Sequence, residues 1–182
     1  MNETHPELHE RVTAGRLLSL AAARLSSNLG SFGSWLLVGV GAAYSLILAN
    51  LASIQEFVSL DSIQSGMVLL LISVVLGVIQ RWLAAIISGT CESAEAAERI
   101  GRDLADQEID LDFKVVFREI ENGTYYPAKW MVRRSFEKAM SGDFAASGRL
   151  SGKLAQIQSL VVFAQVGFSV AAIGLIGGGL HV

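Results

Sequence analysis

The segment SIQSGMVLLLISVVLGVIQ, residues 62–80, has no charged residue and is mostly apolar. A helix needs about 20 such residues to cross a hydrocarbon core of roughly 30 Å, because each residue adds about 1.5 Å. Two further uncharged windows cover residues 25–55 and 154–182. Only 17% of the 182 residues are charged, whereas a soluble domain has about a quarter. The sequence therefore predicts three transmembrane helices.

No segment alternates like an amphipathic strand, so the predicted fold is an all-α, multi-pass membrane protein. A small helical cytoplasmic domain is expected between the second and third spans. The predicted parts are an amphipathic N-terminal helix on the inner leaflet (1–29), spans at 33–55, 63–88 and 154–178, and the helical domain at 89–152. Alternatively, the N-terminal segment extends the first span into the cytoplasm, with a bend at Gly30 and Gly33.

Lysine and arginine flank the predicted spans unevenly. Three precede the first span, eleven lie from Arg81 to Lys153, and none lies in the first loop or after the third span. By the positive-inside rule, the N-terminus and the middle segment are cytoplasmic, and the C-terminus is periplasmic or extracellular. The start, MNETHPELHE, is too polar and acidic for a cleaved signal peptide. We expect residence in the inner (plasma) membrane.

The middle segment contains three helical patterns. Residues 92–108 are expected to continue the second span as a helix. Residues 113–120 place apolar side chains on one face and are followed by the stop signal Asn122-Gly123. Pro127 suits the first turn of a helix that ends at Gly142, and Asp143 is predicted to cap the helix leading into the third span.

Small residues recur every three or four positions in the predicted spans. Such stripes let helix backbones approach closely inside a membrane. Two interpretations are open: the stripes pack the three helices of one protomer together, or they mediate self-association. The residues concerned are Gly41, Ser45, Ala49 and Ser53 in the first span, Ser73 and Gly77 in the second, and Gly167, Ala171, Gly174 and Gly178 in the third.

Charge is divided unevenly along the predicted cytoplasmic domain. Ten acids and four bases lie between residues 92 and 121, whereas six bases and two acids lie between 129 and 153. The simpler interpretation is a helical bundle with acidic and basic faces in contact. The alternative is contact with anionic lipid headgroups or a partner, through Lys129, Trp130, Arg133, Arg134 and Lys138. A nucleic acid partner is not expected, because no extended basic surface remains.

Arg81 follows the second uncharged window directly and is followed by Trp82. A basic residue beside an aromatic one is typical of a cytoplasmic membrane boundary. The sequence therefore favours a membrane anchor at Arg81 and Trp82. The alternative is a pore-lining role for Arg81, with the amide of Asn50 as a further lining group.

The sequence offers no convergent set of catalytic groups. His5 and His9 are spaced like metal ligands but have no third partner, and a single cysteine, Cys91, excludes an intramolecular disulfide. No phosphate-binding glycine loop, zinc-protease motif or nucleophile with a nearby base is present. We therefore expect no enzymatic activity, no cofactor and no metal site.

Two functions remain as hypotheses. The first is a non-enzymatic membrane subunit or scaffold, which assembles in the lipid bilayer with its own copies or with the partners of a membrane complex. It rests on the small-residue stripes and the apolar helix faces of the middle segment. The second is a homo-oligomeric pore of the holin-like or effector-like kind, lined by Ser45, Asn50, Ser53 or Ser73. Layout alone does not decide between them.

Overall fold

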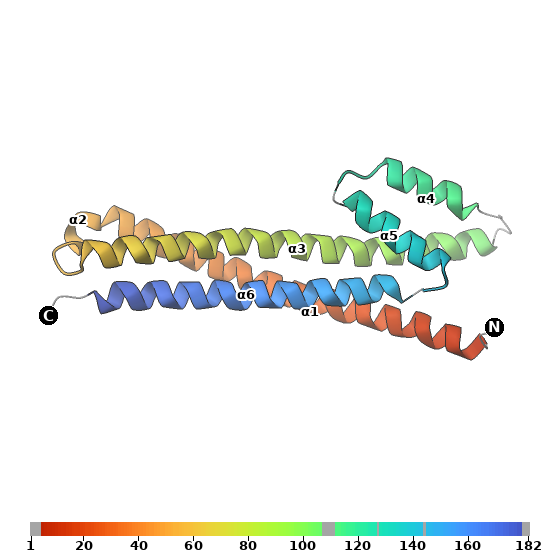
Figure 1. Cartoon of the computed structure of the whole chain (residues 1–182), viewed down its shortest axis with the longest axis horizontal. Helices are drawn as coiled ribbons and strands as arrows, with labels where there is room; N and C mark the ends of the chain where they lie inside the picture. The colour runs from red at the N-terminus through yellow and green to blue at the C-terminus, as the bar shows by residue number, and fades with distance from the viewer. Residues whose placement is uncertain (1–4, 107–111, 127, 144, 180–182) are drawn as a thin grey trace. The chain divides into compact units, whose positions relative to one another are not determined.

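The computed structural model describes residues 5–106, 112–126, 128–143 and 145–179, and these form helices joined by short turns (Figure 1). No β-strand occurs in this described part. Three helices are long, and three are short. Their bounds are α1 (His5–Ala49), α2 (Leu51–Ile54), α3 (Leu60–Asp106), α4 (Phe113–Asn122), α5 (Ala128–Met140) and α6 (Ala146–Gly178).

The three long helices contain segments that are long and apolar enough to cross a membrane, judged by length and composition. These segments are Glu10–Ala49, Leu60–Ile100 and Ala146–Gly178. The all-helical fold and the three apolar helices agree with the sequence prediction. Pro127, which the sequence places in the first turn of a helix, lies outside the described residues.

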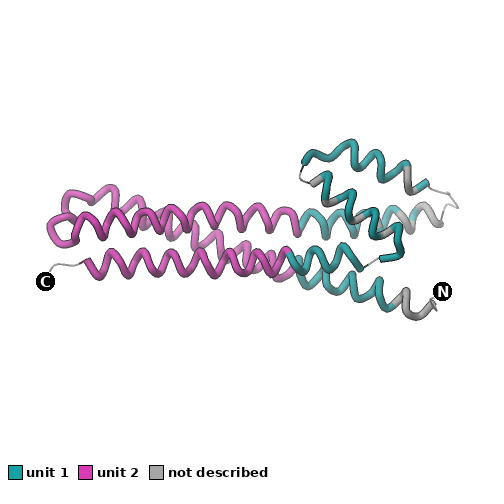
Figure 2. Tube along the Cα trace, viewed as in Figure 1, with its two compact units in different colours: residues 1–23, 88–153 teal, residues 24–87, 154–182 magenta. Residues whose placement is uncertain are grey.

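The chain forms two compact units, and each long helix contributes to both (Figure 2). Unit 1 consists of residues 1–23 and 88–153, and unit 2 consists of residues 24–87 and 154–182. Unit 2 contains all three of the uncharged windows. Unit 1 contains α4, α5 and the charged ends of the long helices.

Unit 2 is a bundle of α1, α3 and α6 whose buried positions recur at alternating spacings of three and four residues. In α6 these positions are Ala155, Gln158, Val162, Gln165, Ser169 and Ala172. This 3.5-residue period is typical of helices that wrap around one another like a coiled coil. Large apolar side chains such as Leu160, Phe163 and Val170 point away from the bundle, as expected for surfaces that contact lipid.

Unit 1 contains a hairpin of α4 and α5. The rings of Phe117 and Phe136 stack with their centroids 4.0 Å apart, and Lys129 Nζ lies 3.9 Å from a carboxylate oxygen of Glu121. One acidic and one basic residue of this region therefore lie close together within the hairpin. Elsewhere in unit 1, Arg16 of α1 forms an ion pair with Glu98 of α3 at 2.5 Å.

Three details of the helix boundaries differ from the sequence prediction or extend it. Helix α1 runs without interruption through Gly30 and Gly33, so no boundary separates an N-terminal helix at 1–29 from a span at 33–55. The first long helix ends at Ala49, and residues 51–54 form the separate helix α2. Asp143 does not cap α6 with its side chain as predicted: the carboxylate accepts hydrogen bonds from the guanidinium of Arg149.

Gly142 ends α5 in the way that the sequence predicts. Its φ angle is +86°, and the N–H of Asp143 donates to the carbonyl of Lys138 at 2.9 Å. This is the left-handed helix termination that favours glycine, since most other residues are about 1–2 kcal/mol less stable there.

We therefore expect Gly142→Ala to lower the free energy of unfolding by about 1 kcal/mol, because alanine must adopt a strained backbone conformation. Thermal unfolding followed by circular dichroism measures the change. Gly142→Asn is the matched control, because asparagine tolerates a positive φ. Equal stability of Gly142→Ala and the wild type would contradict the prediction.

Candidate functional site

Several consecutive turns of the helices in unit 2 bury polar side chains between them. Seven polar residues in the described chain are buried, and all but Ser151 belong to unit 2. The six are Ser26, Ser73, Gln80, Gln158, Gln165 and Ser169, five of them with no exposed surface. They occupy the positions where a water-soluble bundle has leucine or isoleucine. The bundle is therefore apolar outside and polar along part of its axis.

Ser73 and Ser169 join α3 to α6 by hydrogen bonds. Their hydroxyl oxygens lie 2.8 Å apart, and the Ser73 hydroxyl also lies 3.2 Å from the carbonyl oxygen of Gln165. Interhelical hydrogen bonds of this kind contribute on the order of 0.6 kcal/mol each in a membrane. Ser73 thus contributes to helix packing through its hydroxyl as well as through its small size.

Two of the buried glutamines face a glycine on a neighbouring helix. The Gln80 amide nitrogen donates to the carbonyl of Leu29 at 2.8 Å, and its carbonyl oxygen lies 2.8 Å from the place that a Cβ on Gly33 would occupy. The amide of Gln165 approaches Gly77 equally closely. The glycines therefore leave room for the glutamine side chains between the helices.

These hydrogen bonds do not satisfy all the buried polar atoms. Five buried side-chain atoms have no hydrogen-bond partner among the described residues. They are the hydroxyl of Ser26, the carbonyl oxygens of Gln80 and Gln158, and both amide atoms of Gln165. A buried polar group without a partner costs about 1–3 kcal/mol, so such groups mark strain, function or contact with a solvent molecule.

The small residues predicted from the sequence fall into two groups. Ser73 and Gly77 are buried between α3 and the other helices of unit 2. The stripes of α1 and α6 do not pack inside the protomer: a Cβ added at Gly41, Gly167 or Gly174 would meet no atom within 4 Å. The other outward residues, all exposed, are Ser45, Ala49, Ala171 and Gly178, with Ser53 on α2.

Arg81 is exposed on the bundle surface, and its guanidinium donates to the hydroxyl of Ser34 at 2.8 Å. The side chain therefore links α3 to α1 and does not enter the buried polar interior. Trp82 is exposed beside it. The amide of Asn50 donates to the carbonyl of Leu46 at 2.9 Å, within its own chain segment.

Ion pairs partly neutralise the basic residues of α5. Besides the contact of Lys129 with Glu121, the Nε of Arg133 lies 3.0 Å from a carboxylate oxygen of Glu137. The guanidinium of Arg134 lies over the ring of Trp130, 5.3 Å from its centroid. Tyr125 and Tyr126, which precede α5, are exposed. Lys138 of the same helix is also exposed, so three exposed aromatic residues, Tyr125, Tyr126 and Trp130, accompany the basic residues of this region.

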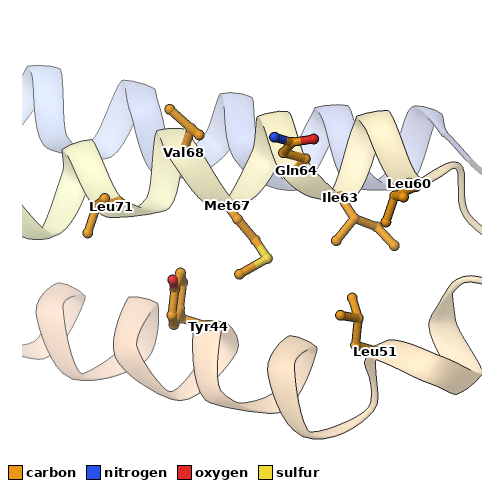
Figure 3. A pocket seen from close by; sticks show the side chains of 8 residues that line it. All are labelled: Tyr44, Leu51, Leu60, Ile63, Gln64, Met67, Val68 and Leu71. Atoms are coloured by element: carbon orange, nitrogen blue, oxygen red, sulfur yellow. The ribbon is translucent and has the colours of Figure 1, made fainter.

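An open cavity of about 350 Å³ lies in unit 2 near α2. Figure 3 shows Tyr44 of α1 and Met67 of α3 pointing toward one another across it. The rest of the lining is mostly aliphatic and comprises Leu51, Leu60, Ile63, Gln64, Val68 and Leu71. The cavity has no charged group, and no cluster of three potential metal ligands occurs among the described residues.

Apart from Ser73, the buried polar residues of unit 2 were not among the site residues predicted from the sequence; these are Ser26, Gln80, Gln158, Gln165 and Ser169. A signal for them exists in the sequence. Small and polar residues recur in α6 at spacings of three and four, and two glutamines stand seven residues apart. A heptad pattern of small and polar residues in an apolar helix thus indicates the interior face.

Comparisons of this chain with protein-family models, with curated proteins and with solved structures find no match. The function is therefore inferred from the geometry of the two units.

Proposed function

We propose that this protein is a non-enzymatic integral membrane scaffold that assembles with its own copies through small-residue faces of α1 and α6. The single observation that carries the proposal is that these faces point away from the other helices of the protomer. Inside a membrane, a stripe of small residues is useful where a second helix approaches it closely.

The α6 face supports self-association most directly. Gly167, Ala171, Gly174 and Gly178 are all exposed and form a stripe spaced by four, three and four residues. The bulky side chain of Val170 is 63% exposed beside this stripe. A groove of glycines flanked by ridges of larger side chains is the shape into which a second helix packs.

The α1 face offers a shorter second surface. Gly41 has open space around its Cα, and Ser45 and Ala49 are exposed. The hydroxyl of Ser45 donates to the carbonyl of Gly41 at 2.9 Å, so it brings no unsatisfied polar group to a helix contact. Two different faces on one protomer allow closed rings as well as dimers.

The distribution of charge supports a cytoplasmic location for unit 1. Every lysine and arginine except Arg24 and Arg81 lies in unit 1, and the positive-inside rule assigns such segments to the cytoplasm. The inner membrane, with α2 and the end of α6 on the outer side, is then the expected location. Unit 1 would present the α4–α5 hairpin to partners or lipid headgroups.

The pore hypothesis has less support. Ser73 bonds to Ser169 within the protomer, so it cannot line a path between copies together with Ser45. Asn50 and Ser45 bond to backbone carbonyls of their own chain segment. Ion flux through liposomes that contain the purified protein would nevertheless establish the pore and replace the scaffold proposal.

Native mass spectrometry of the protein in a mild detergent tests the scaffold proposal. We expect the wild type to form a homo-oligomer and Ala171→Leu/Gly174→Leu to associate on the order of tenfold more weakly, because leucines keep the helix backbones apart. Val170→Leu is the matched control, because it changes a flanking exposed residue of the same helix and leaves the small-residue stripe intact.

A monomeric wild type without co-purifying chains would contradict the proposal, as would a double variant with the wild-type mass. A stable complex with a different chain, lost in the double variant, would retain the α6 face as an interface. It would make the protein a subunit of a hetero-complex.

A further inference from the structure

The α4–α5 hairpin (Figure 1) carries a charge opposite to that of the rest of the chain. Residues 113–140 contain six bases and three acids, a net charge of +3, whereas the whole chain has a formal net charge of −3. The residues outside the hairpin thus contain eight bases and fourteen acids. A negatively charged surface therefore attracts the hairpin and repels the remainder of the chain taken together.

One face of α5 combines an aromatic ring with two positive charges. Trp130, Arg134 and Lys138 follow one another at intervals of four residues, so they share a face of the helix. All three are exposed, and the Arg134 guanidinium lies over the Trp130 ring, 5.3 Å from its centroid. Among the described residues, no carboxylate forms an ion pair with Arg134 or Lys138. These two charges are therefore available to a partner outside the hairpin.

Three exposed aromatic side chains lie in the turn before α5 and in its first helical turn. Tyr125 is 91% exposed, Tyr126 is 84% exposed and Trp130 is 54% exposed. Tyrosine and tryptophan are enriched at membrane–water interfaces, because the ring contacts apolar groups while its polar atom stays hydrated. A layer of anionic lipid headgroups accommodates both these rings and the neighbouring basic side chains.

The hairpin is tethered close to the expected membrane surface. Five residues connect the end of α5 at Met140 to the start of α6 at Ala146. The uncharged window of α6 begins at residue 154, about 12 Å further along the helix at about 1.5 Å per residue. Headgroups are therefore always present within reach of the hairpin, which favours a lipid partner over a soluble protein.

We propose that the α4–α5 hairpin docks on anionic phospholipid headgroups at the cytoplasmic surface of the membrane. Arg134 and Lys138 bind headgroup phosphates, and the three aromatic rings enter the interface. A guanidinium that lies over a ring can still donate from its edge to a phosphate. This docking rests on the membrane location in the proposed function, but it does not depend on self-association.

The accessibility of Trp130 to aqueous acrylamide tests the docking. The chain has three tryptophans, so Trp35→Phe/Trp82→Phe leaves Trp130 as the only one that fluoresces. The protein is reconstituted at one copy per nanodisc, either in phosphatidylcholine alone or with an equal part of anionic phosphatidylglycerol. Both faces of a nanodisc are open to solution, and a single copy excludes contacts between protomers.

We expect acrylamide to quench Trp130 at least about threefold less in the anionic nanodiscs, because docking shields the ring from water. High salt should remove the difference, since the Debye length falls from about 10 Å at 0.1 M to about 3 Å at 1 M. Arg134→Gln/Lys138→Gln should also remove it, because each basic residue near an anionic surface strengthens binding about fivefold.

Arg16→Gln/Arg99→Gln is the charge-matched control. Both arginines belong to unit 1 but lie outside the hairpin, and each pairs with a glutamate. This variant should keep the difference between the two lipids. A second protein that retains only Trp35 reports the membrane location, because Trp35 is 76% exposed within the uncharged window of α1. Its quenching should be weak in both lipids.

Strong and equal quenching of Trp130 in both lipids, with Trp35 protected, would overturn the docking and leave the membrane location intact. Weak and equal quenching of Trp130 would also overturn it, and would show that protein rather than lipid covers the ring. Loss of the difference in the charge-matched control would overturn the assignment to Arg134 and Lys138. Strong quenching of Trp35 would overturn the membrane location and the docking with it.

Discussion

Gly148→Ala is expected to destabilise unit 1 strongly. An added Cβ at Gly148 would collide with the carbonyl of Gly15, with the Gly15 Cα 2.9 Å away. The atoms in the way belong to the backbone of α1, so no side chain can turn aside. The two helices must separate, at a cost of about 1–3 kcal/mol or more.

Gly152 provides a matched control on the same helix. It lies one turn further along α6, in the same unit, and a Cβ there would meet no atom within 4 Å. Gly152→Ala should stabilise the protein by about 0.5–1 kcal/mol, because alanine favours the helix. The two alanine substitutions are thus expected to have opposite signs.

Thermal unfolding in detergent, followed by circular dichroism, measures both variants. Limited proteolysis gives a second readout, since separation of α1 and α6 exposes the surrounding turns of unit 1. The same melting temperature for Gly148→Ala and Gly152→Ala would show that the α1–α6 contact contributes nothing to stability.

Gly66→Leu is expected to have a comparable effect in unit 2. A Cβ at Gly66 would lie 2.5 Å from Cγ1 of Ile176 and 3.2 Å from the carbonyl oxygen of Ala172. Ile176 can change its rotamer, but the backbone of α6 cannot yield without moving the helix. Leucine adds three more carbon atoms to this contact, so we expect a loss of about 1–3 kcal/mol.

The matched control for Gly66→Leu is Gly39→Leu. Gly39 lies in α1 of the same unit, is exposed, and would present its new side chain to open space. The midpoint of heat-induced loss of the gel-filtration peak measures both variants. We expect a lower midpoint for Gly66→Leu and an unchanged midpoint for Gly39→Leu. The reverse order would contradict the helix arrangement of unit 2.

The sequence determined the number of long apolar helices and several helix ends. An uncharged window long enough to cross a bilayer forms a helix because every backbone polar group must be satisfied internally. The Asn122-Gly123 stop and the Gly142 termination are local signals that do not depend on distant residues. The aromatic stack of Phe117 on Phe136 follows from the apolar faces of two adjacent short helices.

The sequence did not determine the continuity of α1. The sequence predicts an amphipathic helix before the first span, with Gly30 and Gly33 as the place for a break. In the structure both glycines are buried in contact with α3, where they make room for Gln80 and Ala84. The glycines therefore allow close packing within a helix that is not broken.

Only the tertiary structure decided which face of each long helix is inside. In a water-soluble protein, the apolar face of a helix is the face that is buried. Lipid is as apolar as the contact between two membrane helices. The periodicity of apolar residues therefore does not show which face of a membrane helix packs against the other helices. The stripe from Gly167 to Gly178 and the heptad series through Gln158 and Gln165 are both plausible packing faces in the sequence. Three-helix packing in unit 2 places the glutamines inside and the glycines of α6 outside, because only the glutamine face meets the small residues of α1 and α3.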